Sequence, residues 1–177
     1  MTLYVYIAQS LDGYIAGPNG EIDWLHDVEN PESSDFGFTK FFEQIDALVM
    51  GRKTFEKVAT FDEWPYNKPV YVISSTVTSL PSKYYGKVIL LNLKPSEIVE
   101  KLESDGLTNL YIDGGSLIQS FLSEDLIDKL IITTIPILLG DGIALFGKLE
   151  SCIILNYEST EVFVNQLVQT TYSVKRE

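Results

Sequence analysis

Cysteine and histidine are almost absent from this sequence. Its 177 residues include one cysteine, Cys152, and one histidine, His26. A single cysteine excludes an intrachain disulfide and favours a reducing compartment, so we expect a cytoplasmic protein. These two residues are too few for a structural zinc site, and no serine stands in a nucleophile-elbow motif. We therefore expect no bound metal, a solvated His26, and a Cys152 that fills a small core position in an apolar strand.

Positive charge and long apolar runs are scarce as well. The chain has 13 Lys and Arg residues against 25 Asp and Glu residues, which gives a formal net charge of −12. Such an acidic surface disfavours nucleic acid and anionic lipid as partners. No lysine or arginine precedes Lys40, so the first residues lack the positive charge that begins a secretory signal. The most apolar stretch, around 130–139, is too short to span a bilayer, and we expect no membrane partner.

What the sequence does contain is an alternation of short apolar segments with amphipathic ones. Hydrophobic residues make up 45% of the chain and charged residues 21%, which is typical of a globular protein, and we expect a single domain over 1–177. The order of the segments predicts an α/β fold with a mostly parallel sheet, antiparallel strands at its C-terminal end, and ligands at the carboxyl ends of the parallel strands. Strands are predicted over 3–8, 47–50, 69–75, 87–93, 109–112, 128–140, 152–165 and 167–177, and helices over 35–45, 52–58, 94–106 and within 113–122.

The stretch VMGRKTF, residues 49–55, places two cations where a predicted strand ends and a helix begins. Gly51 permits a tight turn there, and the free amides at the start of the following helix attract phosphate. Arg52 and Lys53 are unfavourable at that end of a helix by about a few tenths of a kcal/mol, because the helix dipole favours acids there. The pair therefore indicates a binding site for an anion such as phosphate.

Two further strand ends carry groups suited to phosphate. Gly114 and Gly115 lie between a strand and a helix and would let a pyrophosphate approach the backbone, although a turn that needs positive φ explains them as well. Ser74 and Ser75 offer hydroxyls at a third strand end, where ordinary loop serines are the alternative. Three such ends favour a long, multiply charged cofactor that lies across the sheet edge. The sequence contains neither a Walker loop nor the usual Rossmann glycine motif.

Taken together, these motifs resemble those of a known enzyme family. VMGRKTFE (49–56), VYVISS (70–75) and IDGGSLIQSFL (112–122) are similar in order and spacing to dihydrofolate reductases. With SLDGYIAG (10–17) and IPILLGDGIALFG (135–147), the chain resembles still more the reductase domain of bacterial riboflavin biosynthesis proteins, the RibD C-terminal domain. The resemblance implies an NADPH-binding, dihydrofolate reductase-like fold, with a mostly parallel, mixed eight-stranded sheet flanked by helices. It also implies a homodimer.

The same resemblance implies roles for individual positions around NADPH. Arg52, Lys53 and Thr54 would contact the adenosine 2′-phosphate and the pyrophosphate, and the two serines would meet the 2′-phosphate side. Ala8 and Ile15 would border the nicotinamide. The full set of cofactor-binding residues implied in this way is Ala8, Ile15, Gly51, Arg52, Lys53, Thr54, Ser74, Ser75, Gly114, Gly115, Ser116 and Leu117.

On the substrate side, the resemblance places residues 16–24 in a mobile loop that closes over the site. We expect Trp24 and Phe38 to contact the substrate. Reduction of a C=N bond also needs a proton, and Asp35 is the candidate donor. It falls one turn before Phe38 on an apolar helix face, where burial raises the pKa of a carboxyl group. The alternative, equally open here, is that Asp35 caps or charges the start of that helix.

The favoured function is an NADPH-dependent reductase that transfers a hydride to a pyrimidine- or pterin-like heterocycle. The resemblance implies the riboflavin type, which reduces 5-amino-6-(5-phosphoribosylamino)uracil. Dihydrofolate reductase proper is an alternative, although this chain has Lys68 where folate enzymes hold the glutamate tail with an arginine, whose fork suits a carboxylate better. The second alternative is a non-catalytic, nucleotide-binding dimeric scaffold. Residues 128–139 could supply its dimer surface, unless they form a buried core strand.

Overall fold

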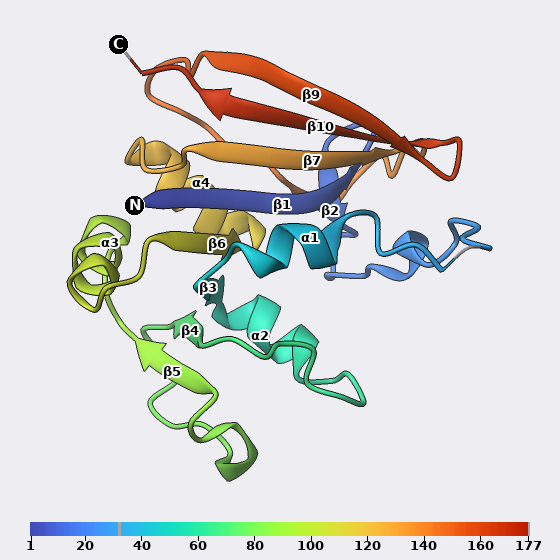
Figure 1. The fold of residues 1–177 in the computed structure, drawn as a ribbon. Coiled ribbons are helices and arrows are strands. Elements are labelled where there is room, and N and C mark those ends of the chain that lie inside the picture. The colour runs from blue at the N-terminus through green and yellow to red at the C-terminus, as the bar shows by residue number, and fades with distance from the viewer. Residues whose placement is uncertain (32, 177) are drawn as a thin grey trace.

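A mixed eight-stranded sheet forms the centre of the computed structural model, which describes residues 1–31 and 33–176 (Figure 1). Its strands are β1 (Thr2–Ser10), β3 (Ala47–Gly51), β4 (Val70–Ile73), β5 (Val88–Leu91), β6 (Asn109–Asp113), β7 (Lys129–Ile135), β9 (Leu155–Phe163) and β10 (Leu167–Val174). They lie in the order β5-β4-β3-β6-β1-β7-β10-β9. The strands β5, β4, β3, β6, β1 and β7 run parallel to one another. Strands β10 and β9 continue the sheet in antiparallel pairs. The predicted fold class is confirmed.

Helices connect the parallel strands, and a second, much smaller sheet lies beside the large one. The helical segments are α1 (Phe38–Glu43), α2 (Arg52–Val58), α3 (Pro95–Ser104) and α4 (Gly115–Ser123), with single 3₁₀ turns η1 (Asp23–Leu25) and η2 (Ser82–Tyr84). The small sheet pairs β2 (Tyr14–Ala16) with β8 (Ile143–Ala144). We did not predict this pairing, because segments of two and three residues are too short to show an alternating pattern.

The helix predicted from residue 35 begins three residues later. Gly37 adopts a left-handed backbone with φ of 87°, which ends the preceding loop and starts α1 at Phe38. Asp35 therefore lies in the loop before the helix and not on its apolar face.

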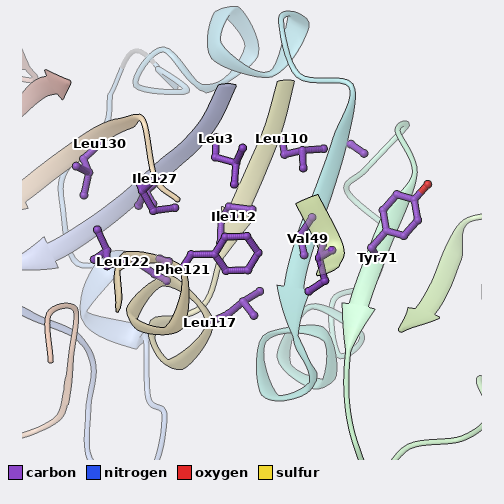
Figure 2. Packing of buried hydrophobic residues seen from close by; sticks show 14 of the residues in the cluster. Leu3, Val49, Tyr71, Leu110, Ile112, Leu117, Phe121, Leu122, Ile127 and Leu130 are labelled. Carbon is purple, nitrogen blue, oxygen red and sulfur yellow. The ribbon is translucent and has the colours of Figure 1, made fainter. Parts of the chain in front are cut away.

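The central parallel strands β3, β4 and β6 bury both of their faces, because helices cover the sheet on both sides. Along β3, Ala47 and Val49 face α3 and α4, whereas Leu48 and Met50 face α1 and α2. Figure 2 shows the first of these two layers, in which Phe121 of α4 packs against the strands. All five of these side chains are fully buried. This packing holds the strand ends in fixed positions and so makes the carboxyl edge of the sheet rigid.

The opposite face carries an aromatic cluster. The ring of Tyr6, on β1, stacks on Phe41 of α1 with centroids 4.5 Å apart. Phe38 meets Tyr6 edge to face at 5.6 Å, and Tyr111 of β6 meets Phe41 edge to face at 5.3 Å. Such pairs add to the burial energy of large rings, so they fix the short helix α1 to the sheet.

Two expectations about the C-terminal part of the chain can be checked against the structure. Strand β7 lies between β1 and β10 and is largely buried, which fits the core-strand interpretation for residues 129–135, whereas Pro136 and Leu138 beyond it are exposed. The prediction for Cys152 is wrong. It is exposed and lies outside the strands, because β9 begins only at Leu155.

Strand β9 is an edge strand, and most of its side chains are exposed. Phe163 packs beside Leu167 on the face of the sheet that carries α1. On the other side, Val162 is 62% exposed and pairs with Val168, which is 41% exposed. Among the described residues, no helix has the length and the apolar character needed to cross a membrane.

Candidate functional site

The candidate site lies at the carboxyl edge of the parallel strands, where the predicted phosphate-binding segments meet. Gly51 at the end of β3 is in register with Ile73 at the end of β4, and Met50 is in register with Asp113 at the end of β6. Because β4, β3 and β6 are neighbours, the turns that follow them lie side by side. The structure thus brings together the segments 51–54, 74–75 and 114–117, which lie far apart in the sequence.

Two of these turns are in direct contact. Gly114 has φ of +100°, and a Cβ atom added to it would overlap the side-chain oxygen of Thr54 and lie 3.8 Å from the backbone nitrogen of Gly51. A side chain at position 114 is therefore excluded by its backbone conformation and by the lack of space. Gly114 is the residue before α4, and the first amides of a nine-residue helix have no partner within the helix. These amides, from Gly115 to Leu117, can bind an anion at this edge.

Ile15 meets the same turn from the other direction. A Cβ atom on Gly115 would lie 2.8 Å from Cδ1 of Ile15 and 3.5 Å from the carbonyl oxygen of Ala144. Ile15 and Ala144 belong to the small sheet of β2 and β8. The carboxylate of Asp12 holds this small sheet to the large one: it accepts hydrogen bonds from Ser10 Oγ at 2.5 Å and from the Gly140 amide at 2.8 Å. Ile15 is thereby fixed next to the turn after β6.

Strands β1 and β6 separate before they reach this edge. Their ladder runs from Thr2 and Asn109 to Tyr4 and Tyr111, whereas β1 continues beside β7 as far as Ser10. The Tyr111 hydroxyl donates to the carbonyl oxygen of Tyr6 at 2.8 Å, two residues past the last paired residue of β1. Beyond this point the two strands leave the sheet edge open between them. In such α/β sheets, ligands bind at this kind of opening.

Asp113 is the acidic residue that stands at this opening, and our sequence analysis missed it. It ends β6, is half-buried, and burial raises the pKa of its carboxyl group to about 6, although the Gly114 amide hydrogen bond opposes the shift. Its charge in turn adds to the effect of burial in raising the pKa of the Tyr66 and Tyr111 phenols. A carboxylate at the end of a buried strand, just before two glycines, was the available signal.

Asp35 lies in a different environment from the one we predicted. Its carboxylate accepts hydrogen bonds from the Gly37 amide at 3.0 Å and from the Thr39 amide at 2.8 Å. Hydrogen bonds from the Thr39 side chain, the Thr39 amide and the Gly37 amide lower its pKa. The expectation of a raised pKa is wrong, because Asp35 is exposed and satisfies the free amides at the start of α1. The capping interpretation fits this geometry.

The two residues expected on the substrate side are both placed near β1. Trp24 is buried in a cluster with Ala8 and Phe36, and its indole N–H has no hydrogen-bond partner among the described residues. A buried, unpaired N–H is unfavourable by about 1–3 kcal/mol unless a ligand or a water molecule accepts from it. Phe38 packs on Tyr6, whose hydroxyl donates to the Phe36 carbonyl oxygen at 2.6 Å.

The basic residues that the sequence analysis singled out differ in what they contact. Arg52 lies 3.5 Å from Glu56 in an exposed ion pair one turn along α2, and Lys53 is exposed. Lys68 is committed elsewhere: its ammonium group donates to the carbonyl oxygens of Phe42 at 2.6 Å, Glu43 and Ile45. It therefore neutralises the C-terminal end of α1 and is not placed to hold the carboxylate of a ligand.

The hydroxyl of Ser74 also serves the protein itself. It accepts the Val77 amide at 2.9 Å and the Thr76 amide at 3.2 Å, so it shapes the turn that follows β4. Ser75, one residue on, is exposed at the same edge. Within residues 1–31 and 33–176, no group of three or more His, Cys, Asp or Glu side chains is arranged to hold a metal ion.

The sheet order and the open edge define a dihydrofolate reductase-like protein. Residues 1–168 match the family described as RibD C-terminal domain, and the chain belongs to this family, which is the branch that its motifs resemble. It is similar to the protein YwjB of Bacillus subtilis (strain 168), with 36% identity over 171 residues that cover 95% of each sequence. The family match, which extends over nearly the whole chain, supports an enzyme of reductase type.

Two solved structures support the same assignment. One is a Shewanella sp. PV-4 protein, assigned provisionally to riboflavin biosynthesis, with 51% identity, a TM-score of 0.96, and coverage of 99% of this chain and 100% of the other. The other is dihydrofolate reductase from Enterococcus faecalis complexed with NADP(H), with 20% identity, a TM-score of 0.67, and coverage of 99% and 97%. At 20% identity, the second likeness shows the fold alone.

The geometry of Asp113 leads to a prediction about stability. The folded-state pKa of about 6 lies above the ordinary value of about 3.8, so the folded protein binds more protons than the unfolded chain between these values. Asp113 therefore lowers stability as pH rises from about 4 to about 6. Asp113→Asn removes the charge, and it should raise the free energy of unfolding at pH 7.5 by about 1–3 kcal/mol.

Urea unfolding at several pH values tests this expectation. The difference between Asp113→Asn and wild type should vanish below about pH 4, grow up to about pH 6, and stay constant above. The control is Asp128→Asn, in the loop before β7 at the other end of the sheet. The Asp128 carboxylate accepts from the Leu3 amide and pairs with Arg176, so this variant should not be more stable than wild type at pH 7.5. If Asp113→Asn is less stable than wild type at pH 7.5, the expected cost of burying the Asp113 carboxylate is contradicted.

Proposed function

We propose that the protein is an NADPH-dependent reductase that transfers a hydride to a pyrimidine- or pterin-like heterocycle. The observation that carries this proposal is the convergence of the turns 51–54 and 114–117 at the open edge between β1 and β6. When bound there, the dihydronicotinamide of NADPH would supply the hydride. A nucleotide-binding scaffold without activity would use the same turns. The scaffold hypothesis, however, gives no role to the half-buried carboxylate of Asp113 at the opening.

The residues present fit a dinucleotide phosphate. Gly114 leaves no Cβ atom between the two turns, and nothing lies within 4 Å of the position that a Cβ atom would take on Gly51. The backbone at both turns is thus open to close approach by phosphate oxygens. The first amides of α4 would bind the pyrophosphate, with Thr54 beside them. Leu117 would contribute only its backbone amide, because its side chain is buried in the core.

Arg52 would recognise the 2′-phosphate that distinguishes NADPH from NADH. It is partly exposed at the start of α2, and its guanidinium fork suits a phosphate. Lys53 and Ser75 are exposed at the same edge and would share this anion. Ala8 and Ile15 would border the nicotinamide, since β1 and the small sheet stand on the other side of the turn after β6.

Asp113 is our candidate for the proton donor. With a pKa of about 6, roughly one carboxyl group in ten is protonated at pH 7, compared with about one in a thousand for an ordinary aspartate. A general acid with a pKa close to the working pH is effective. Asp35, the donor expected from the resemblance, is held ionised by the hydrogen bonds at the start of α1. The proposal thus assigns the role of proton donor to Asp113 and not to Asp35.

Replacement of Arg52 tests the cofactor assignment. Arg52→Ala removes a charge-assisted contact with the 2′-phosphate, so the KM for NADPH should rise about tenfold, while the KM for NADH should change less than twofold. Steady-state kinetics with both cofactors measures this ratio, and NADP⁺ binding measured by fluorescence checks it without turnover. Lys40→Ala, an exposed lysine on α1, is the control and should leave both values unchanged. A cofactor ratio that does not change in Arg52→Ala would rule out this role.

A pair of isosteric variants decides between the two carboxylates. Asp113→Asn should lower kcat by about a hundredfold or more with NADP⁺ affinity retained, because amides cannot supply the proton. Wild-type kcat should fall as pH rises above about 6, and this dependence should be lost in Asp113→Asn. Asp35→Asn should keep most of the rate. If Asp35→Asn loses activity and Asp113→Asn keeps it, the donor is Asp35 after all.

We also propose that the protein is a homodimer through β9 and β10, on the face of these two strands where Val162 and Val168 are exposed. On that face Val162 pairs with Val168 and Thr160 pairs with Thr170, so it is apolar and uncharged in a chain of net charge −12. Such a face can meet its own copy without charge repulsion. Tyr157 continues it and is 66% exposed.

Light scattering tests the dimer. Wild type should have a mass near twice 19.9 kDa, and Val162→Asp should give the monomer, because it places two carboxylates in the interface. Ser159→Asp is the control on the opposite face of β9 and should stay dimeric. A monomeric wild type, or a dimeric Val162→Asp, would contradict the proposed interface.

A further inference from the structure

The substrate side of the site is built from a part of the chain that has no basic residues except one histidine. Residues 1–39 contain no lysine or arginine, and they contain seven Asp and Glu residues. This part includes β1, the small-sheet strand β2, and the loops that lead to α1. Asp12 and Asp35 both have lowered pKa values because of the hydrogen bonds that they accept, so they are ionised at neutral pH.

Many of the other basic residues are placed away from this side or are already paired, whereas Lys40 is exposed on α1. All 13 lysines and arginines fall within the residues that the structure describes. Several of them pair with acids at the far end of the sheet: Lys101 with Asp105, Lys129 with Glu158, and Arg176 with Asp128. Lys68 is held by the carbonyl oxygens that end α1. Lys94 follows β5, the edge strand, two strands away from β3.

The cations of helix α2 lie beside the turns that we assign to the cofactor. The phosphates of the cofactor would need these cations. Arg52 pairs with Glu56 at 3.5 Å. Lys57 is close enough to Glu21 to help lower the pKa of that carboxylate, after the hydrogen bonds from Asn19. The 2′-phosphate of NADPH alone carries a charge of about −1.5 to −2, and the pyrophosphate adds more. The cations of α2 would therefore serve the cofactor, and a net charge of −12 disfavours a second bound phosphate.

What the substrate side does offer is aromatic surface, held in place by internal hydrogen bonds, and a buried indole N–H. Phe38 and Tyr6 meet edge to face, and Gln169 donates from its amide to the Tyr6 hydroxyl at 3.0 Å and to Thr133 Oγ1 at 2.9 Å. The indole N–H of Trp24 is buried and unpaired among the described residues. These groups suit a flat, polar ring and provide no counter-ion for an anionic substituent.

We propose that the substrate of this enzyme is a pyrimidine- or pterin-like ring that carries neither a phosphate nor a carboxylate. The inference rests on the proposed reductase function and narrows its substrate. It separates this chain from an enzyme that reduces a phosphoribosyl pyrimidine and from one that reduces a folate with its glutamate tail, because each of those substrates brings an anion that needs a cation near the ring.

Two matched pairs of substrates test the proposal with the wild-type protein and NADPH. In the first pair, 5-amino-6-ribosylaminouracil and its 5′-phosphate, only the phosphate differs. In the second pair, 7,8-dihydrobiopterin and 7,8-dihydrofolate share the pterin ring, and the longer side chain of dihydrofolate carries the glutamate. We expect kcat/KM to be at least tenfold higher for the member without the anion, in whichever pair is reduced. A kcat/KM for the phosphorylated or glutamylated member that equals or exceeds that of its partner overturns the proposal.

A binding measurement tests the same point without turnover. Thermal shifts are recorded with ribose 5-phosphate, and with ribose as control, in the presence of saturating NADP⁺. We expect no saturable shift from ribose 5-phosphate, because the cofactor occupies the only turns that we assign to phosphate. A saturable shift that persists in Arg52→Ala reveals a second anion site and overturns the proposal.

Failure of the reductase function itself gives a different result. If NADP⁺ causes no thermal shift, the cofactor assignment fails, and ribose 5-phosphate binding that is lost in Arg52→Ala then marks an anion site at the turn after β3. The substrate proposal fails only through anion binding that does not depend on Arg52, or through preference for the anionic member of a pair.

Discussion

The candidate site depends on the close approach of two turns that lie more than 60 residues apart in the sequence. Gly114 leaves no room for a Cβ atom beside Thr54, so the backbone after β6 lies directly against the start of α2. This contact is possible because β3 and β6 are paired neighbours whose ends are in register. The buried helices on both faces hold these ends in place. The open backbone at the sheet edge is therefore a consequence of core packing and glycine geometry together.

The second feature of the site is a separation of charge. The cations of α2 stand on one side of the turn after β6, whereas the acidic first part of the chain, with Asp12, supplies the other. Such a division suits a reaction between an anionic cofactor and a ring that has no anion of its own. Asp113 lies between the two sides. Its half-buried carboxylate is unfavourable for stability, and it is the group to which we assign the proposed proton transfer.

Local sequence patterns predicted the fold well, but they predicted the environments of individual residues less well. The apolar runs at 47–50 and 109–112 became neighbouring central strands, because runs of this length without polar alternation need cover on both faces. Asp35 was misplaced, since the left-handed Gly37 moved the helix start past it. Cys152 is exposed because β9 starts later than its apolar neighbours suggested.

The amino-acid sequence alone determined the order of strands and helices, the three turns with phosphate-binding character, the shortage of cations before Lys40 and the family resemblance, because each of these is a local property of composition or spacing. Only the tertiary structure decided which carboxylate is buried and which lysine is free. The pKa of Asp113 depends on the side chains packed around the end of β6, and the use of Lys68 depends on the carbonyl oxygens that end α1, more than 20 residues away. Burial and hydrogen bonding at such distances arise from the packing of separate elements, which no local pattern records.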